Sequence, residues 1–278
     1  MMVTKRKEPW RRQWLLKMST ARKSAGLKLG HWPVDSSLKR KSYFALFDTL
    51  SQTGFRKSEV SVAHTKQFDP TYHITRSNLI WRIGGTLVVS PTRLQLANLT
   101  EADCAVLVPP PSKTDQFGVI WGDKPIYLPV RFNETMCAAL SLRDLELTFP
   151  CRGSQRLTIP LFQFEEGIAF TYHQFEIILH DLKDLALPVS ADPSLFTYHS
   201  FRIYLCTSLG AAKVPSADIQ AILRWQSPAS LIIYNRMQPE DYVSLIDKAN
   251  SAVITSYSTA NFPMIDSDDL SMTLDEVR

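Results

Sequence analysis

Histidine, arginine and tyrosine residues recur at defined spacings in the second half of the chain. His199 and Arg202 are three residues apart in H-S-F-R, so on a helix their side chains project from one face. Trp225 follows Arg202 by 23 residues, and Tyr234 follows Trp225 by nine. Arginines bind phosphate oxygens, a histidine accepts protons near neutral pH, and a tyrosine hydroxyl can form a covalent intermediate. The set is therefore suited to chemistry at a phosphodiester.

Further residues of this kind lie upstream. The segment T-G-F-R-K-S-E places Arg56 and Glu59 on one face of a turn, and Lys113 stands in P-S-K-T-D between them and His199. Each residue alone has an ordinary interpretation: a surface ion pair of little energetic value, a solvated loop lysine, or a core aromatic residue. The order of the whole set favours a catalytic role. It runs Arg and Glu, Lys, H-x-x-R, an aromatic residue, and then Tyr.

This order and spacing resemble those of the tyrosine recombinases, the phage integrase superfamily. The resemblance covers roughly residues 40–250 and is most specific at T-G-F-R-K-S-E and from H-S-F-R through R-W-Q-S-P-A-S-L-I-I-Y. It implies a site-specific DNA recombinase or integrase that cuts and rejoins strands through a 3′-phosphotyrosyl intermediate. It also implies an α+β, predominantly helical fold, the catalytic-domain fold of that family, with a small antiparallel β-sheet.

The resemblance implies six catalytic residues and one supporting residue. The catalytic residues are Arg56, Lys113, His199, Arg202, Trp225 and Tyr234, and Glu59 supports Arg56. Trp225 stands where the family carries a second histidine, a replacement that some active members share. Lys113 matches the family's hairpin lysine, with Lys124 as the alternative because hairpin sequences align loosely. We expect these side chains to converge on one concave surface, with the lysine on a hairpin beside it.

The residue types explain how such a reaction would run. Transfer of a phosphodiester to a phenol places negative charge on the non-bridging oxygens, which two arginines can hold. A phenol with a pKa of about 10 must lose its proton as it attacks, and His199 can accept that proton. Lys113 can protonate the departing 5′ sugar oxygen. We expect no cofactor and no metal, since the sequence contains neither a P-loop nor an acidic metal cluster.

Periodicity and turn signals predict the elements that position these residues. The pattern predicts a helix over 42–53 that ends at Gly54, and a strand or hairpin within 78–89, broken at Gly84-Gly85. Further strands are expected over 104–108, 118–121 and 126–130, and residues 150–165 are expected to be irregular. Helices are expected over 133–147, within 166–187, and over 199–211, 216–225, 228–236 and 239–250. This order is typical of the α+β class.

Charge divides the chain into three parts. Residues 1–41 hold twelve Lys and Arg residues against two acidic residues, whereas the remainder holds nineteen basic and twenty-five acidic residues. We expect residues 1–41 to form a partly disordered basic arm that contacts a phosphate backbone, with Trp10 and Trp14 packing on sugar or on protein. The catalytic domain is expected over 42–250 and an acidic, fraying tail over 251–278.

The expected partner is double-stranded DNA, and the resemblance implies a monomer when free and a homotetramer on DNA. The predicted helix 239–250 could serve a neighbouring subunit or pack in its own core. In the family a helical core-binding domain precedes the catalytic domain, and here about 40 residues precede the matching region. A truncated gene, a clamp supplied by a partner, or loss of recombination would each account for this difference.

Other classes of protein are disfavoured. The sequence opens with no secretory signal, and its apolar runs are too short to span a bilayer, so neither secretion nor a membrane partner is expected. The four cysteines form no C-x-x-C pair, which favours reduced thiols in a prokaryotic cytoplasm or a eukaryotic nucleus. Two alternatives remain: an inactive or domesticated DNA-binding protein derived from a mobile element, and a type IB topoisomerase-like enzyme. The spacing between H-S-F-R and the tyrosine favours a recombinase over the topoisomerase.

Overall fold

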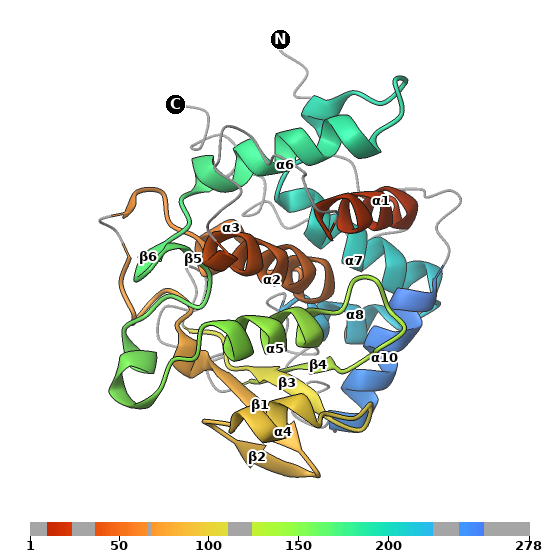
Figure 1. Cartoon of the computed structure of the whole chain (residues 1–278). Helices are drawn as coiled ribbons and strands as arrows, with labels where there is room; N and C mark the ends of the chain where they lie inside the picture. Colours follow the sequence, from red (N-terminus) through yellow and green to blue (C-terminus); the bar gives the residue numbers. More distant parts are fainter. Residues whose placement is uncertain (1–9, 24–36, 66–67, 111–123, 225–238, 253–278) are drawn as a thin grey trace.

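A computed structural model describes residues 10–23, 37–65, 68–110, 124–224 and 239–252 (Figure 1). The helices in these ranges are α1 (Arg12–Lys23), α2 (Ser37–Thr53), α3 (Lys57–Val60), α4 (Arg93–Ala97), α5 (Ala138–Thr148), α6 (Tyr172–Ala186), α7 (His199–Ala211), α8 (Ser216–Ile222) and α10 (Pro239–Ser251). The strands are β1 (Leu79–Ile83), β2 (Thr86–Val88), β3 (Cys104–Leu107), β4 (Ile126–Pro129), β5 (Gln163–Glu165) and β6 (Ile168–Ala169), and short 3-10 turns are η2 (Arg76–Asn78), η3 (Gly153–Leu157) and η4 (Pro193–Leu195). The chain is therefore α+β with a small antiparallel sheet, as its sequence predicts.

The larger sheet has four strands in the order β2-β1-β3-β4, and every neighbouring pair is antiparallel. Gly84 and Gly85 adopt positive φ at the turn between β1 and β2, so of the two predicted alternatives, a strand or a hairpin, the structure shows the hairpin. The connection from β3 to β4 carries both candidate lysines. Lys124 is half-buried just before β4, whereas Lys113 and the predicted strand 118–121 lie outside the described residues.

Helix α2 lies at the centre of the fold. Figure 1 shows α1 and α6 on one side of α2, with α5 and the four-stranded sheet on the other. Its apolar face is buried through Leu46, Phe47 and Leu50, and the ring of Phe47 meets Phe201 of α7 edge-on at 5.1 Å. The predicted end of this helix is confirmed, because Gly54 follows Thr53 in a left-handed conformation.

Helix α5 begins five residues later than the expected start at residue 133. The expected first-turn acid, Glu134, instead forms an ion pair with Arg12 of α1 at 3.1 Å. The side chain of Gln52 from α2 sets the start of the helix: its Nε2 donates to the Met136 carbonyl, and its Oε1 accepts from the Ala138 N–H. The prediction was wrong because this cap comes from a different helix.

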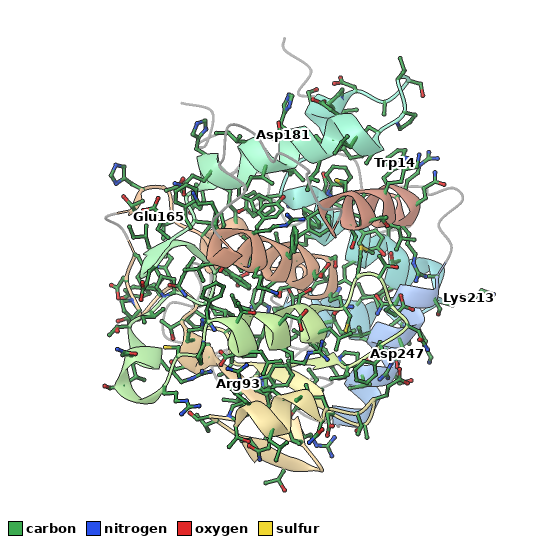
Figure 2. The ribbon with its side chains drawn as sticks, in the orientation of Figure 1. Trp14, Arg93, Glu165, Asp181, Lys213 and Asp247 are labelled. Atoms are coloured by element: carbon green, nitrogen blue, oxygen red, sulfur yellow. The ribbon has the colours of Figure 1, made fainter. Side chains whose placement is uncertain are left out.

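The N-terminal segment contributes to the core. Trp10 is fully buried and stacks on Phe196 at 4.8 Å, and Trp14 meets the same ring edge-on at 5.4 Å (Trp14 is labelled in Figure 2). Helix α1 packs against α6. Trp10, Trp14, Leu15 and Met18 of the expected arm therefore belong to the same core as the helices of the expected domain 42–250, and both tryptophans pack on protein. Residues 1–9 and 24–36 lie outside the described ranges.

Helix α10 packs against its own domain. Tyr242, Ile246 and Ala249 are buried where the helix crosses α7 and β4. Asp247, labelled in Figure 2, accepts two hydrogen bonds from the guanidinium of Arg131 at the end of β4. Of the two roles open to this helix, the structure shows docking in its own core.

Several remaining boundaries differ from expectation. Residues 163–169, part of which we expected to be irregular, form the hairpin of β5 and β6. Helix α8 ends at Ile222 instead of residue 225, while α7 spans the predicted residues 199–211. The predicted helix 228–236 and the acidic tail from residue 253 onward fall outside the described chain.

All four cysteines are buried thiols. No helix in the described ranges is both long and apolar enough to cross a membrane.

Removal of the Trp10 side chain tests whether the N-terminal segment is part of the core. We predict that Trp10→Ala lowers the free energy of unfolding by about 3–5 kcal/mol, because it leaves a cavity between Phe196 and Phe201. Urea unfolding followed by circular dichroism measures the change. The exposed Lys17 on α1 provides the control, since Lys17→Ala should stay within about 0.5 kcal/mol of the wild type. Equal stability of Trp10→Ala and the wild type would contradict the packing.

Candidate functional site

The turn between α2 and α3 forms the centre of the candidate site. Gly54 has a φ of 58°, and a Cβ atom at this position would lie 2.8 Å from the side chain of Leu223. Glycine is therefore required by conformation and by packing. The turn places Arg56 directly before α3, with Glu59 in the first turn of that helix.

Glu59 is the common partner of this region. Its carboxylate is 3% exposed and accepts hydrogen bonds from the backbone N–H of Arg56 and from Nη2 of Arg224, the latter at 2.9 Å. Taken alone, Arg56 and Glu59 are most simply interpreted as a surface ion pair, although the resemblance implies that Glu59 supports Arg56. Instead, the acid is buried and bound by an arginine 165 residues away.

Arg202 connects α7 to the same turn. Its guanidinium donates from Nη1 to the carbonyl of Gly54 at 3.0 Å and from Nη2 to the carbonyl of Leu223. The side chain is almost fully buried. Phe201, the residue before it, fixes this part of α7 by packing against Phe47. Arg202 therefore lies beneath the surface and joins the end of α2 to the end of α8.

Arg224 is the residue of the site that the sequence reasoning missed. It follows the C-terminal end of α8 with a φ of 56°, an uncommon conformation for a residue with a Cβ atom. Its guanidinium lies 4.4 Å from the centre of the Phe55 ring while it binds Glu59. Its place directly before Trp225 in R-W-Q-S was the only available signal, and that signal is weak.

Electrostatics keep Glu59 ionised. Burial by itself raises the pKa of the Glu59 carboxyl, but the guanidiniums of Arg224, Arg56 and Arg202, together with the hydrogen bond from the Arg56 N–H, lower it further than burial raises it. The pKa therefore lies below its usual value. Three guanidiniums against one carboxylate leave two excess positive charges in this cluster, and Arg56, which is half-buried, is its most accessible arginine.

The predicted site is only partly within the described ranges. Glu59 lies within the electrostatic influence of Arg56 and Arg202, and His199 is half-buried at the start of α7, one turn before Arg202. Lys113, Trp225 and Tyr234 lie outside the described residues. Their expected convergence with the arginines stays a prediction.

Four of the described tyrosines are poor nucleophile candidates. Tyr43, Tyr198, Tyr204 and Tyr242 are buried. Burial raises the phenol pKa of Tyr198, Tyr204 and Tyr242, which disfavours the reactive phenolate. The Arg224 charge partly offsets this effect at Tyr242.

A second buried ion cluster has a structural role. Glu146 of α5 binds Arg76 at 3.0 Å and Arg156 at 2.9 Å, and all three side chains are buried. Arg156 also donates to the carbonyls of Arg76 and Leu79, which fastens η3 to the start of β1. Within the described part of the chain, no group of three or more His, Cys, Asp and Glu side chains could hold a metal ion.

Comparison with known proteins adds no identification. No model of a known protein family matches the chain, and searches of curated proteins and of solved structures give no match either.

Neutralising Glu59 tests the electrostatic role of the cluster. We predict that Glu59→Gln lowers the free energy of unfolding by about 3 kcal/mol at pH 7, because it leaves Arg224 buried without its counter-charge. The folded-state pKa of Glu59 lies below the unfolded value of about 4.3. Its ionic contribution is therefore complete above the unfolded pKa and is lost as pH falls through the folded-state pKa. The difference between variant and wild type should shrink as pH falls below about 4.

Urea unfolding at a series of pH values measures this difference. The exposed Glu166 offers a matched control, because Glu166→Gln removes the same charge outside the cluster and should change stability by less than about 0.5 kcal/mol. A loss of stability in Glu59→Gln that is equal at pH 7 and pH 3 would show that charge is not its cause.

Proposed function

We propose that this chain is the catalytic domain of a tyrosine recombinase, a site-specific DNA recombinase or integrase. The observation that best supports the proposal is the meeting of Arg56, Arg202 and Arg224 at one buried carboxylate, although they lie far apart in sequence. A surplus of permanent positive charge is what a phosphodiester under nucleophilic attack requires. The order of the candidate residues along the chain supports a recombinase specifically.

In the proposed reaction, each residue has a defined role at the phosphodiester, the attacking phenol or the departing 5′ oxygen. Arg56, at the accessible edge of the cluster, binds a non-bridging oxygen, while the charge of Arg202 acts from beneath. Tyr234 attacks the phosphorus, and His199 accepts its phenolic proton. The lysine of the β3–β4 connection, Lys113 or Lys124, protonates the departing 5′ oxygen. Trp225 packs beside the reacting groups. Attack by a strand's 5′ hydroxyl on the phosphotyrosyl bond then rejoins the DNA and restores the enzyme.

The first prediction from this proposal is a covalent protein–DNA adduct at Tyr234. Nicked suicide duplexes trap such an adduct because the leaving strand diffuses away after cleavage. A library of these duplexes with randomised sequence avoids a choice of target site. We expect an adduct with the wild type, none with Tyr234→Phe, and a cross-linked peptide containing Tyr234 in mass spectrometry.

Tyr72→Phe is the matched control, because Tyr72 is an exposed tyrosine on a loop and its loss should leave the adduct unchanged. An adduct at another tyrosine would overturn the assignment of the nucleophile. DNA binding without any adduct would favour the domesticated DNA-binding protein. Relaxation of supercoiled plasmid through a Tyr234 adduct, without exchange of strands between duplexes, would favour the topoisomerase-like enzyme.

The second prediction concerns assembly and salt. We expect the free protein to be a monomer, because α10 buries its apolar residues in its own domain. We expect DNA binding to fall by about 100-fold between 50 mM and 200 mM salt, the change for about four contacted phosphates. Light scattering and fluorescence anisotropy provide the measurements. A stable tetramer without DNA, or salt-insensitive nanomolar binding, would contradict this account.

A further inference from the structure

We propose that Tyr198 is a positioning residue, whose hydroxyl fixes the start of α7 and thereby holds His199 in a set position relative to Arg56. The inference rests on the proposed function, in which His199 accepts a proton, and adds a residue to it. Tyr198 directly precedes α7 and is 4% exposed, so it lies beneath the surface that substrate would contact. Its effect must therefore pass through its neighbours.

The hydroxyl of Tyr198 joins the start of α7 to the end of α3. Its oxygen lies 3.2 Å from Oγ of Ser61, the buried residue that follows α3. Ser61 Oγ gives its only proton to the carbonyl of Lys57 at 2.9 Å, so Tyr198 is the donor in the bond between the two hydroxyls. Burial raises the phenol pKa of Tyr198, which keeps that proton in place.

Arg202 provides a second contact one turn further along α7. Tyr198 has helical backbone angles, so residues 198 and 202 lie on one face of the helix, roughly 6 Å apart along its axis. Arg202 binds the carbonyl of Gly54, which lies before α3 in the chain. Tyr198 binds Ser61, which lies after α3. A helix held at one point can rotate about that contact, whereas two contacts on one face fix its rotation against α3.

This rotation sets the place of His199. The residue follows Tyr198 by one position, which is about 100° around the helix. Because Tyr198 and Arg202 face the residues that flank α3, His199 lies to one side of that face, where it is half-buried. Arg56 stands directly before α3. The two bonds from α7 therefore determine where the His199 imidazole lies relative to the proposed phosphate-binding arginine.

The ring of Tyr198 is held independently of its hydroxyl. It lies 3.9 Å from the ring of Phe175 on α6, at an interplanar angle of 31°. Phe175 is fully buried and also lies 6.4 Å from the ring of Phe201 on α7. Tyr198→Phe keeps this packing and removes only the link to Ser61. The substitution therefore tests the hydroxyl without emptying the core.

Single-turnover adduct formation on a nicked duplex that the wild type cleaves yields a rate constant separately from an amplitude. We expect Tyr198→Phe to lower the rate constant by about tenfold, part of the roughly 100-fold to 10,000-fold that a positioned general base contributes. The amplitude should remain full, and the Kd for DNA should stay within about threefold, because the hydroxyl does not contact substrate.

The variant His199→Ala identifies the cause. In this background Tyr198→Phe should lower the rate constant no further, because no imidazole is left to position. Losses that multiply in the double variant would show that Tyr198 acts through other residues, and would overturn the inference.

Two further variants complete the test. Tyr198→Phe combined with Ser61→Ala removes both partners, leaves no buried hydroxyl of this pair unbonded, and should be as slow as Tyr198→Phe alone. Tyr204 is the matched control, because Tyr204→Phe removes a similarly buried hydroxyl from the same helix and should cleave at the wild-type rate. An equal loss of rate in Tyr204→Phe would show that any buried hydroxyl of α7 has this effect, and would contradict the specific role of Tyr198.

The remaining outcomes separate this inference from the proposed function. A reduced amplitude at an unchanged rate constant would show that Tyr198 only maintains the folded state, and would overturn its positioning role. An unchanged rate in Tyr198→Phe, with an active wild type, would overturn the inference and leave the proposed function intact. A wild type that forms no adduct would overturn the proposed function and this inference with it.

Discussion

The candidate site depends on one buried carboxylate. Glu59 holds the Arg56 backbone and the Arg224 side chain, and its charge also acts on Arg202. An ionised group is costly to bury unless it is paired and hydrogen-bonded. Glu59 meets that condition only when the end of α2, the start of α7 and the end of α8 lie together. Without its charge the three guanidiniums would repel one another, so the same carboxylate that gathers the arginines also sets how the three helices meet.

The sequence predicts those features of the fold that are set locally. The end of α2 at Gly54, the interruption of the extended segment at Gly84-Gly85 and the extent of α7 each follow from residues within the element or beside it. Features set by distant residues were missed. The start of α5 depends on Gln52, 86 residues before Ala138, and the burial of Trp10 depends on Phe196 and Phe201. No periodicity within a short window contains that information.

The same distinction applies to the candidate site. Arg56, Glu59 and Arg202 could be selected because their order along the chain resembles that of a known enzyme family, and in the structure the charges of both arginines act on Glu59. The burial of Glu59 could not be foreseen, since an arginine and a glutamate three residues apart usually form a solvated pair. Arg224 has no spacing rule of its own. Its importance follows from a backbone conformation and a partner 165 residues away.

Buried arginines can still act on a surface phosphate. At an effective dielectric constant of 20, one unit charge acts on another about 8 Å away with about 2 kcal/mol, compared with about 0.5 kcal/mol in water. The cluster holds two excess positive charges around Glu59, so its field at the accessible edge of Arg56 is substantial. In the proposed reaction the phosphodiester gains negative charge as the phenol attacks. The field therefore stabilises the transition state more than the bound substrate, which is the condition for catalysis. It acts on any phosphate equally, so recognition of a DNA sequence requires residues outside this cluster.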